Sequence, residues 1–153
     1  MNVKIFMQKW AKQLDEVESI LMYLNTYPDV LKEMGCSELI PGINIEIDMG
    51  NWLRQFNQFD NLEKEFYNEH WIPIERTAYK FFIDLSSPKY PIYEVMYIYG
   101  KGKKEKYIRS VLFESVIDLL LMIDQPKVLK EYLEVNLFER NYSYLDEFLS
   151  DPF

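Results

Sequence analysis

The stretch that decides the fold is residues 71–124, which read WIPIERTAYKFFIDLSSPKYPIYEVMYIYGKGKKEKYIRSVLFESVIDLLLMID. Three runs rich in aromatic and β-branched residues lie at 78–85, 92–99 and 107–112. Ser-Ser-Pro at 86–88 and a segment of glycine and lysine at 100–106 separate them. Such runs between turn segments are typical of strands. The stretch therefore predicts an antiparallel meander.

The meander leads into helices. Ser115 and Asp118 have the spacing of a capping box, which marks the start of a helix. The apolar positions that follow have helical spacing: Val116, Leu119, Leu120 and Ile123. Gln125-Pro126 ends this helix and begins another that runs to about residue 138, and Ser143 with Asp146 predicts a short terminal helix.

The N-terminal half alternates between helical and extended patterns. Apolar residues recur at steps of three and four and predict a helix over residues 4–25. Pro28 interrupts it, a short helix is expected over 29–34, and Pro41-Gly42 forms a turn. Alternation of apolar and polar residues over 43–49 predicts a short half-buried strand, and aromatic positions over 52–67 predict a helix.

These elements describe one domain of the α+β class. The chain has 153 residues, a length that buries roughly 70% of the unfolded surface in a single core. No internal repeat, low-complexity tract or linker divides it. We predict a single domain over residues 1–153, with an antiparallel sheet of about four to five strands and helices packed at the N-terminal and C-terminal ends.

The charge balance indicates the kind of partner. The sequence has 25 acidic and 17 basic residues, a formal net charge of −8. Negative charge repels phosphate backbones, so nucleic acid is not expected as a partner and a basic protein is favoured. A second interpretation stays open, in which the charge only keeps a small domain soluble.

The single cysteine and the single histidine limit the chemistry. Cys36 cannot form an internal disulfide, and His70 has no second histidine with which to share a metal. We therefore expect no metal and no cofactor. The segment 1–10 lacks the apolar core of a secretory signal, and the longest apolar run is far shorter than the roughly 20 residues of a membrane span. A cytoplasmic protein is expected.

Enzymatic interpretations depend on few residues. On a strand, Glu46 and Asp48 would lie about 7 Å apart on one side, a separation that inverting glycosidases use. Nothing in the sequence marks either carboxyl group as having a raised pKa, and an ordinary exposed strand face explains the pair equally well. No serine or cysteine elbow accompanies His70. A small carbohydrate-active enzyme is thus a remote alternative, and no catalysis is expected.

Four sequence segments carry a resemblance to a known family. They are Trp71-Ile72-Pro73-Ile74, Phe81-Phe82-Ile83-Asp84-Leu85, Pro91-Ile92-Tyr93, and Leu112-Phe113-Glu114-Ser115-Val116-Ile117-Asp118-Leu119-Leu120. This order of three strands and a helix start resembles the SUKH (SMI1/KNR4-like) superfamily. The resemblance covers about half of the chain.

The resemblance implies a non-catalytic binding function. Bacterial members of the superfamily are typically immunity proteins that bind and neutralise partner toxins, and fungal members regulate cell-wall synthesis. An immunity protein that occludes a basic toxin domain is the first function that the resemblance implies. A regulatory or scaffold protein related to the cell wall or envelope is the alternative.

Two surfaces are candidates for partner binding. Between residues 131 and 153, six acidic residues face one arginine, and aromatic residues lie among them. Aromatic side chains supply contact energy while carboxylates set partner choice. The candidates at this end are Glu134, Glu139, Tyr142, Tyr144, Asp146 and Glu147. The alternative is a terminal helix pair with its aromatic residues packed inward.

The second candidate surface is one face of the strand at 92–99. Tyr93, Tyr97 and Tyr99 alternate with the more apolar positions Ile92, Met96 and Ile98. If the apolar face is the core, the tyrosines line a groove that a partner can enter. The alternative is that a helix covers them. The lysines at 101, 103, 104 and 106 are expected to form a solvated turn that protects the sheet edge.

Overall fold

The structure is a computed structural model, and it describes residues 2–24, 26–27, 45–74, 80–99 and 105–137. The helix expected at 29–34, the turn at Pro41-Gly42 and the terminal helix after Ser143 lie outside these residues. So do Cys36 and the first three lysines of the expected turn. Within the described residues, the fold is of the α+β class, as predicted.

The meander is a four-stranded antiparallel sheet in the order β1-β2-β3-β4. Its strands are β1 (Trp71–Pro73), β2 (Phe81–Asp84), β3 (Ile92–Tyr99) and β4 (Glu105–Phe113). Trp71 pairs with Asp84, Phe82 pairs with Tyr93, and a bulge interrupts the β3–β4 ladder between Ile92 and Tyr93. Each strand thus pairs with the next one along the chain, which confirms the predicted meander.

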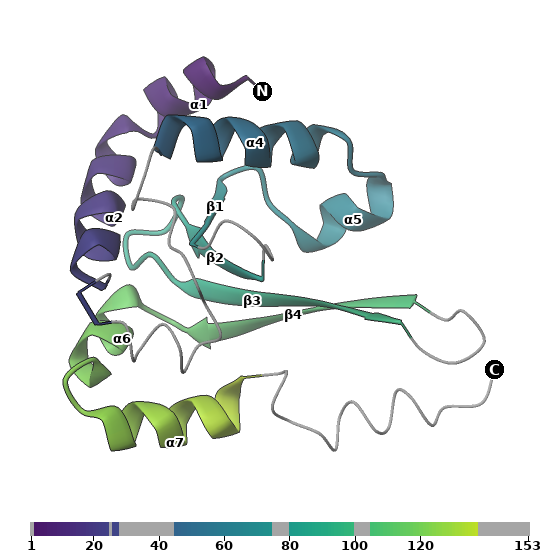
Figure 1. The fold of residues 1–153 in the computed structure, drawn as a ribbon. Helices are drawn as coiled ribbons and strands as arrows, with labels where there is room; N and C mark the ends of the chain where they lie inside the picture. The colour runs from purple at the N-terminus through teal and green to yellow at the C-terminus, as the bar shows by residue number, and fades with distance from the viewer. Residues whose placement is uncertain (1, 25, 28–44, 75–79, 100–104, 138–153) are drawn as a thin grey trace.

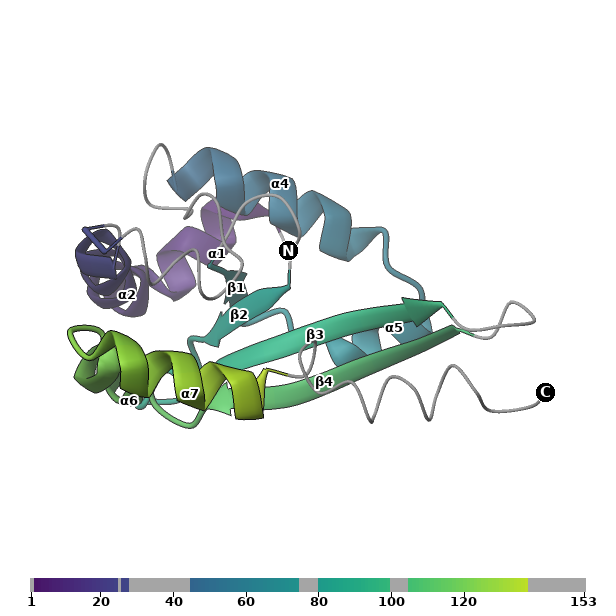
Figure 2. The same cartoon turned by 60° about the horizontal axis from the view of Figure 1, so that its bottom comes forward.

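The helices surround this sheet (Figure 1). They are α1 (Val3–Lys9), α2 (Ala11–Leu24), α4 (Ile45–Asn57), α5 (Asn61–Phe66), α6 (Val116–Met122) and α7 (Pro126–Asn136). Figures 1 and 2 together show α5 and α7 on opposite sides of the β3–β4 hairpin, and α2 at the end of the sheet. None of the helices in the described part of the chain is long and apolar enough to cross a bilayer.

The helix predicted over residues 4–25 is two consecutive helices. Its backbone changes direction at Trp10, whose φ and ψ are −110° and 21°. Hydrogen bonds continue across the break, because the Trp10 amide donates to Phe6 at 3.0 Å and the Leu14 amide donates to Trp10 at 2.8 Å. The apolar stripe is preserved and buried in both helices: Phe6, Leu14, Val17, Leu21 and Leu24.

The strand predicted over 43–49 is wrong, because residues from Ile45 onward form α4. Met49 and Trp52 are fully buried at a helical step of three. The alternation at 43–49 was too short to distinguish a strand from the first turns of an amphipathic helix. Glu46 and Asp48 therefore lie on a helix and not on the strand that the glycosidase geometry requires.

The helix predicted over 52–67 also divides. α4 ends at Asn57, and Asp60 begins α5 through a capping box with Glu63. The Glu63 amide donates to the Asp60 carboxylate at 2.8 Å. The predicted aromatic side is present: the ring of Trp52 lies 5.8 Å from that of Phe59 and 5.0 Å from that of Phe82 in β2. An aromatic cluster thus joins α4 to the sheet.

The C-terminal helices follow the prediction closely. Ser115 is the N-cap of α6 and accepts a hydrogen bond from the Ile117 amide at 3.2 Å. Pro126 opens α7, which ends at Asn136. Tyr132 stacks on Phe113 at 4.9 Å between ring centroids, and its hydroxyl donates to the Leu112 carbonyl. These two contacts join α7 to β4.

Candidate binding surfaces

The face of β3 that carries the tyrosines is part of the core at the start of the strand. Tyr93 is half-buried and stacks on Trp71 with 4.5 Å between centroids and 22° between planes. Val95, the next residue on that face, is buried. In the ladder, Tyr97 pairs with Tyr107 and Tyr99 pairs with Glu105. The prediction of an open groove is therefore wrong at Tyr93, because the aromatic rings of β1, β2 and α4 pack on this face.

The other face of β3 is buried as well. Ile92 is fully buried, and Glu94 is only 1% exposed. Glu94 lies opposite Ser110 in the ladder. Both faces of the first half of β3 are covered, which explains why the contrast between tyrosine and isoleucine positions did not identify the solvent side.

Glu134 is the one member of the C-terminal candidate set that lies in the described residues. It is exposed on α7. Its predicted neighbours lie outside them: Glu139, Tyr142, Tyr144, Asp146 and Glu147. Tyr132, also in α7, packs against the core, and its pKa is raised because the hydroxyl is partly buried and lies near Asp118 and Glu114.

Apolar side chains on the outside of α6 and α7 were not predicted. Val135 is 74% exposed and Leu121 is 64% exposed, and Ile117 and Val128 are exposed too. Ile117 and Leu121 share one side of α6, and Val128 and Val135 share one side of α7, by the helical repeat. A second apolar stripe, offset from the buried Leu129 and Leu133, was the signal in the sequence.

We call these four residues and the carboxylates beside them the α6–α7 face. Glu131 lies between Val128 and Val135 on the same stripe, and Asp124 follows Ile123, the C-cap of α6. From 114 to 137 the acidic residues are Glu114, Asp118, Asp124, Glu131 and Glu134, against Lys127 and Lys130. The segment 114–137 therefore combines exposed aliphatic groups with an excess of acidic residues.

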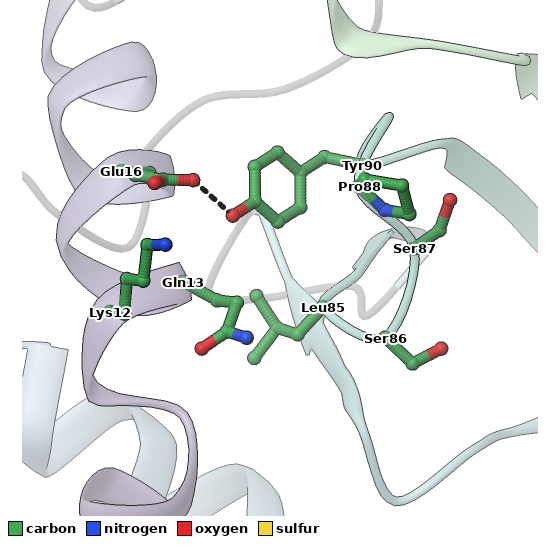
Figure 3. A pocket seen from close by; sticks show the side chains of 8 residues that line it. All are labelled: Lys12, Gln13, Glu16, Leu85, Ser86, Ser87, Pro88 and Tyr90. Carbon is green, nitrogen blue, oxygen red and sulfur yellow. Dashed lines mark hydrogen bonds between the residues drawn. The ribbon is translucent and has the colours of Figure 1, made fainter.

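A hollow of about 390 Å³ lies between α2 and the turn from β2 to β3 (Figure 3). Its lining residues are Lys12, Gln13, Glu16, Leu85, Ser86, Ser87, Pro88 and Tyr90. This volume is within the range of small-ligand sites, about 300–1,000 Å³. Nothing in the sequence pattern brought residues 12–16 together with 85–90.

Tyr90 connects the two sides of the hollow. Its hydroxyl donates to the Glu16 carboxylate across 74 residues of chain. Burial raises the pKa of Tyr90 to about 12, and the hydrogen bond with Glu16 adds to this, so the phenol remains a donor at neutral pH. Tyr90 also has a φ of 47°, a left-handed conformation that costs a non-glycine residue about 1–2 kcal/mol.

The single histidine lies beside an aspartate and a serine without forming a hydrolytic triad. His70 Nε2 is 3.4 Å from Asp84 Oδ1, and the Ser86 hydroxyl donates to the same oxygen at 2.6 Å. Asp84 is thus the central member, whereas a triad needs the imidazole between the hydroxyl and the carboxylate. The described residues also contain no group of three His, Cys, Asp or Glu side chains placed to hold a metal ion.

Comparisons of the chain with protein-family models, with curated proteins and with solved structures gave no match.

Proposed function

We propose that this chain is a non-catalytic protein-binding domain, an immunity protein that neutralises a basic toxin domain in the cytoplasm by occluding it. The observation that carries the proposal is the α6–α7 face, where Leu121 and Val135 are more than half exposed. Large apolar side chains gathered on a surface commonly mark a site for a partner. The resemblance of the strand and helix segments to the SUKH superfamily supports the same function.

The energetic argument favours a protein partner over simple solubility. Burying an exposed leucine or valine side chain contributes about 1.5–3 kcal/mol when burial is complete. Charged residues alone keep a domain soluble without any exposed aliphatic groups. Net charge therefore does not explain the four exposed aliphatic residues of the α6–α7 face, whereas burial under a partner does.

The negative charge of the chain indicates that the partner carries a positive charge. Residues 114–137 contain five acidic residues against two lysines, and the whole chain carries −8. A complementary potential accelerates association and rejects acidic proteins. Toxins that attack nucleic acid need positive charge at their active sites, so an acidic inhibitor suits them.

The test is capture of the partner with variants of the α6–α7 face. Leu121→Lys/Val135→Lys removes two aliphatic contacts and adds charge that repels a basic partner. Ile5→Lys is the matched control, because Ile5 is 51% exposed on α1, which lies far from α7 in Figure 1. Each form is used to capture proteins from the source cells, and the captured partner is co-expressed with it.

We expect wild type and Ile5→Lys to retain a basic partner in a stoichiometric complex and to suppress its toxicity, and the double variant to lose both. Retention by the double variant would remove the α6–α7 face as the site. A partner that is not toxic and acts in envelope synthesis would replace immunity with the regulatory or scaffold function.

A further inference from the structure

The hollow between α2 and the turn at 85–90 contains polar groups that have no partner among the residues that the structure describes. Lys12 and Gln13 form no hydrogen bond or ion pair with any residue that the structure describes. In Figure 3 the Gln13 side chain extends from α2 toward the turn and lies next to Leu85, and the Lys12 side chain runs along α2 on the side of Glu16. Among the described residues, the hollow thus places an ammonium group and an amide without a partner beside apolar side chains.

Lys12 is available because Glu16 is engaged elsewhere. The two residues are four apart on α2, a spacing at which lysine and glutamate usually attract each other. Glu16 instead accepts the hydroxyl of Tyr90, and within the described residues Lys12 and Glu16 form no ion pair. Glu16 and Lys12 thus lie on the same α2 wall of the hollow, and the Tyr90 hydroxyl reaches the Glu16 carboxylate from the turn (Figure 3).

The groups in the hollow indicate which chemistry they recognise. An ammonium group binds a carboxylate, and a glutamine amide can both donate to and accept from a peptide group. Leu85 and Pro88 supply an apolar wall. The hydroxyls of Ser86 and Ser87 point away from α2, and Ser86 is hydrogen-bonded to Asp84 (Figure 3). Glu16 beside Lys12 disfavours ligands with two negative charges, such as phosphate.

We propose that this hollow binds the carboxyl-terminal end of a peptide chain. Lys12 contacts the terminal carboxylate, Gln13 bonds to the last peptide group, and the last side chain packs on Leu85 and Pro88. Tyr90 and Glu16, joined by their hydrogen bond, line the site. This site lies on α2 and the β2–β3 turn, separate from the α6–α7 face, and does not depend on the proposed function.

The probe is N-acetyl-glycyl-leucine, compared with its C-terminal amide and with acetate. Binding is followed by the amide chemical shifts of the ¹⁵N-labelled chain. We expect the acid to bind at least tenfold more tightly than the amide and than acetate, with shifts confined to residues 12–16 and 85–90. Lys12→Gln should remove the preference for the acid, while Lys130→Gln, an exposed lysine on α7, should keep it.

Each other outcome overturns part of the proposal or all of it. Equal affinity for acid and amide would exclude recognition of the carboxylate, and equal affinity for acetate would exclude recognition of the peptide. Shifts located elsewhere, or no shifts at millimolar probe, would exclude the site. Unfolding temperatures of the two lysine variants, which alter exposed residues only, verify that loss of binding is not loss of fold.

Discussion

The aromatic cluster around Trp52 and the α6–α7 face use large apolar residues in opposite ways. Trp52 has no exposed surface, and the rings of Phe59, Tyr67 and Phe82 surround it. On the α6–α7 face, Leu121 and Val135 lie mostly in solvent. The aromatic residues, which are the usual anchors of interfaces, stabilise the interior here, and aliphatic residues occupy the surface. Residue type therefore does not distinguish the surface from the core here, whereas exposure does.

The largest effect is expected from breaking the aromatic cluster. Trp52→Ala removes a fully buried side chain that connects α4 to β2, and should lower the free energy of unfolding by about 3–5 kcal/mol. Urea denaturation measures this. A loss below about 1 kcal/mol would mean that α4 does not depend on the cluster for its position.

A smaller loss is expected where α7 joins the sheet. Tyr132→Phe removes the hydrogen bond to the Leu112 carbonyl and should lower the free energy of unfolding by about 1 kcal/mol. Tyr23→Phe is the control, because the Tyr23 and Tyr27 hydroxyls are 2.9 Å apart at an exposed position. The same urea series should show a smaller loss for the control. Equal losses would contradict the part-buried setting of Tyr132.

The Tyr90 contact should make stability depend on alkaline pH. Because the pKa of Tyr90 is raised from 10.0 to about 12, the unfolded chain releases this proton before the folded protein does. The contribution is fully present below pH 10 and is lost as the pH rises from 10 through about 12. Denaturation at pH 9 and pH 12 should show the stability advantage of wild type over Tyr90→Phe shrinking. A constant difference would contradict the buried, bonded phenol.

The smallest effect is expected on the α6–α7 face itself. Val135→Ala should change the free energy of unfolding by less than about 0.5 kcal/mol, because its side chain packs little against the core. Together with Trp52→Ala, this variant compares the stability contribution of an exposed apolar side chain with that of a buried one. A destabilisation above 1 kcal/mol would mean that Val135 belongs to the core of the protein.

Local signals predicted much of the fold. The alternation and turn residues predicted β3 with its observed bounds, Ile92–Tyr99, because strand pattern and turn chemistry agree there. Ser115 and Pro126 predicted the starts of α6 and α7 because caps act within one turn. The four apolar positions from 43 to 49 gave a wrong prediction of a strand, because a short alternation also fits the first turns of α4.

The candidate sites were less predictable because they depend on contacts between distant segments. Glu16 and Tyr90 are 74 residues apart, and no local pattern connects them. Tyr93 stands on the face where Trp71 stacks, so its burial depends on strand pairing. The α6–α7 face was present in the sequence as a second apolar stripe, but periodicity alone does not say which of two stripes faces the core.

The measurement that tests the central claim most directly is the affinity of the captured partner for wild type, Ile5→Lys and Leu121→Lys/Val135→Lys. If the α6–α7 face is the binding surface, wild type and Ile5→Lys bind equally, and the double variant binds at least a hundredfold more weakly with unchanged stability. Equal affinity of all three forms would contradict the account.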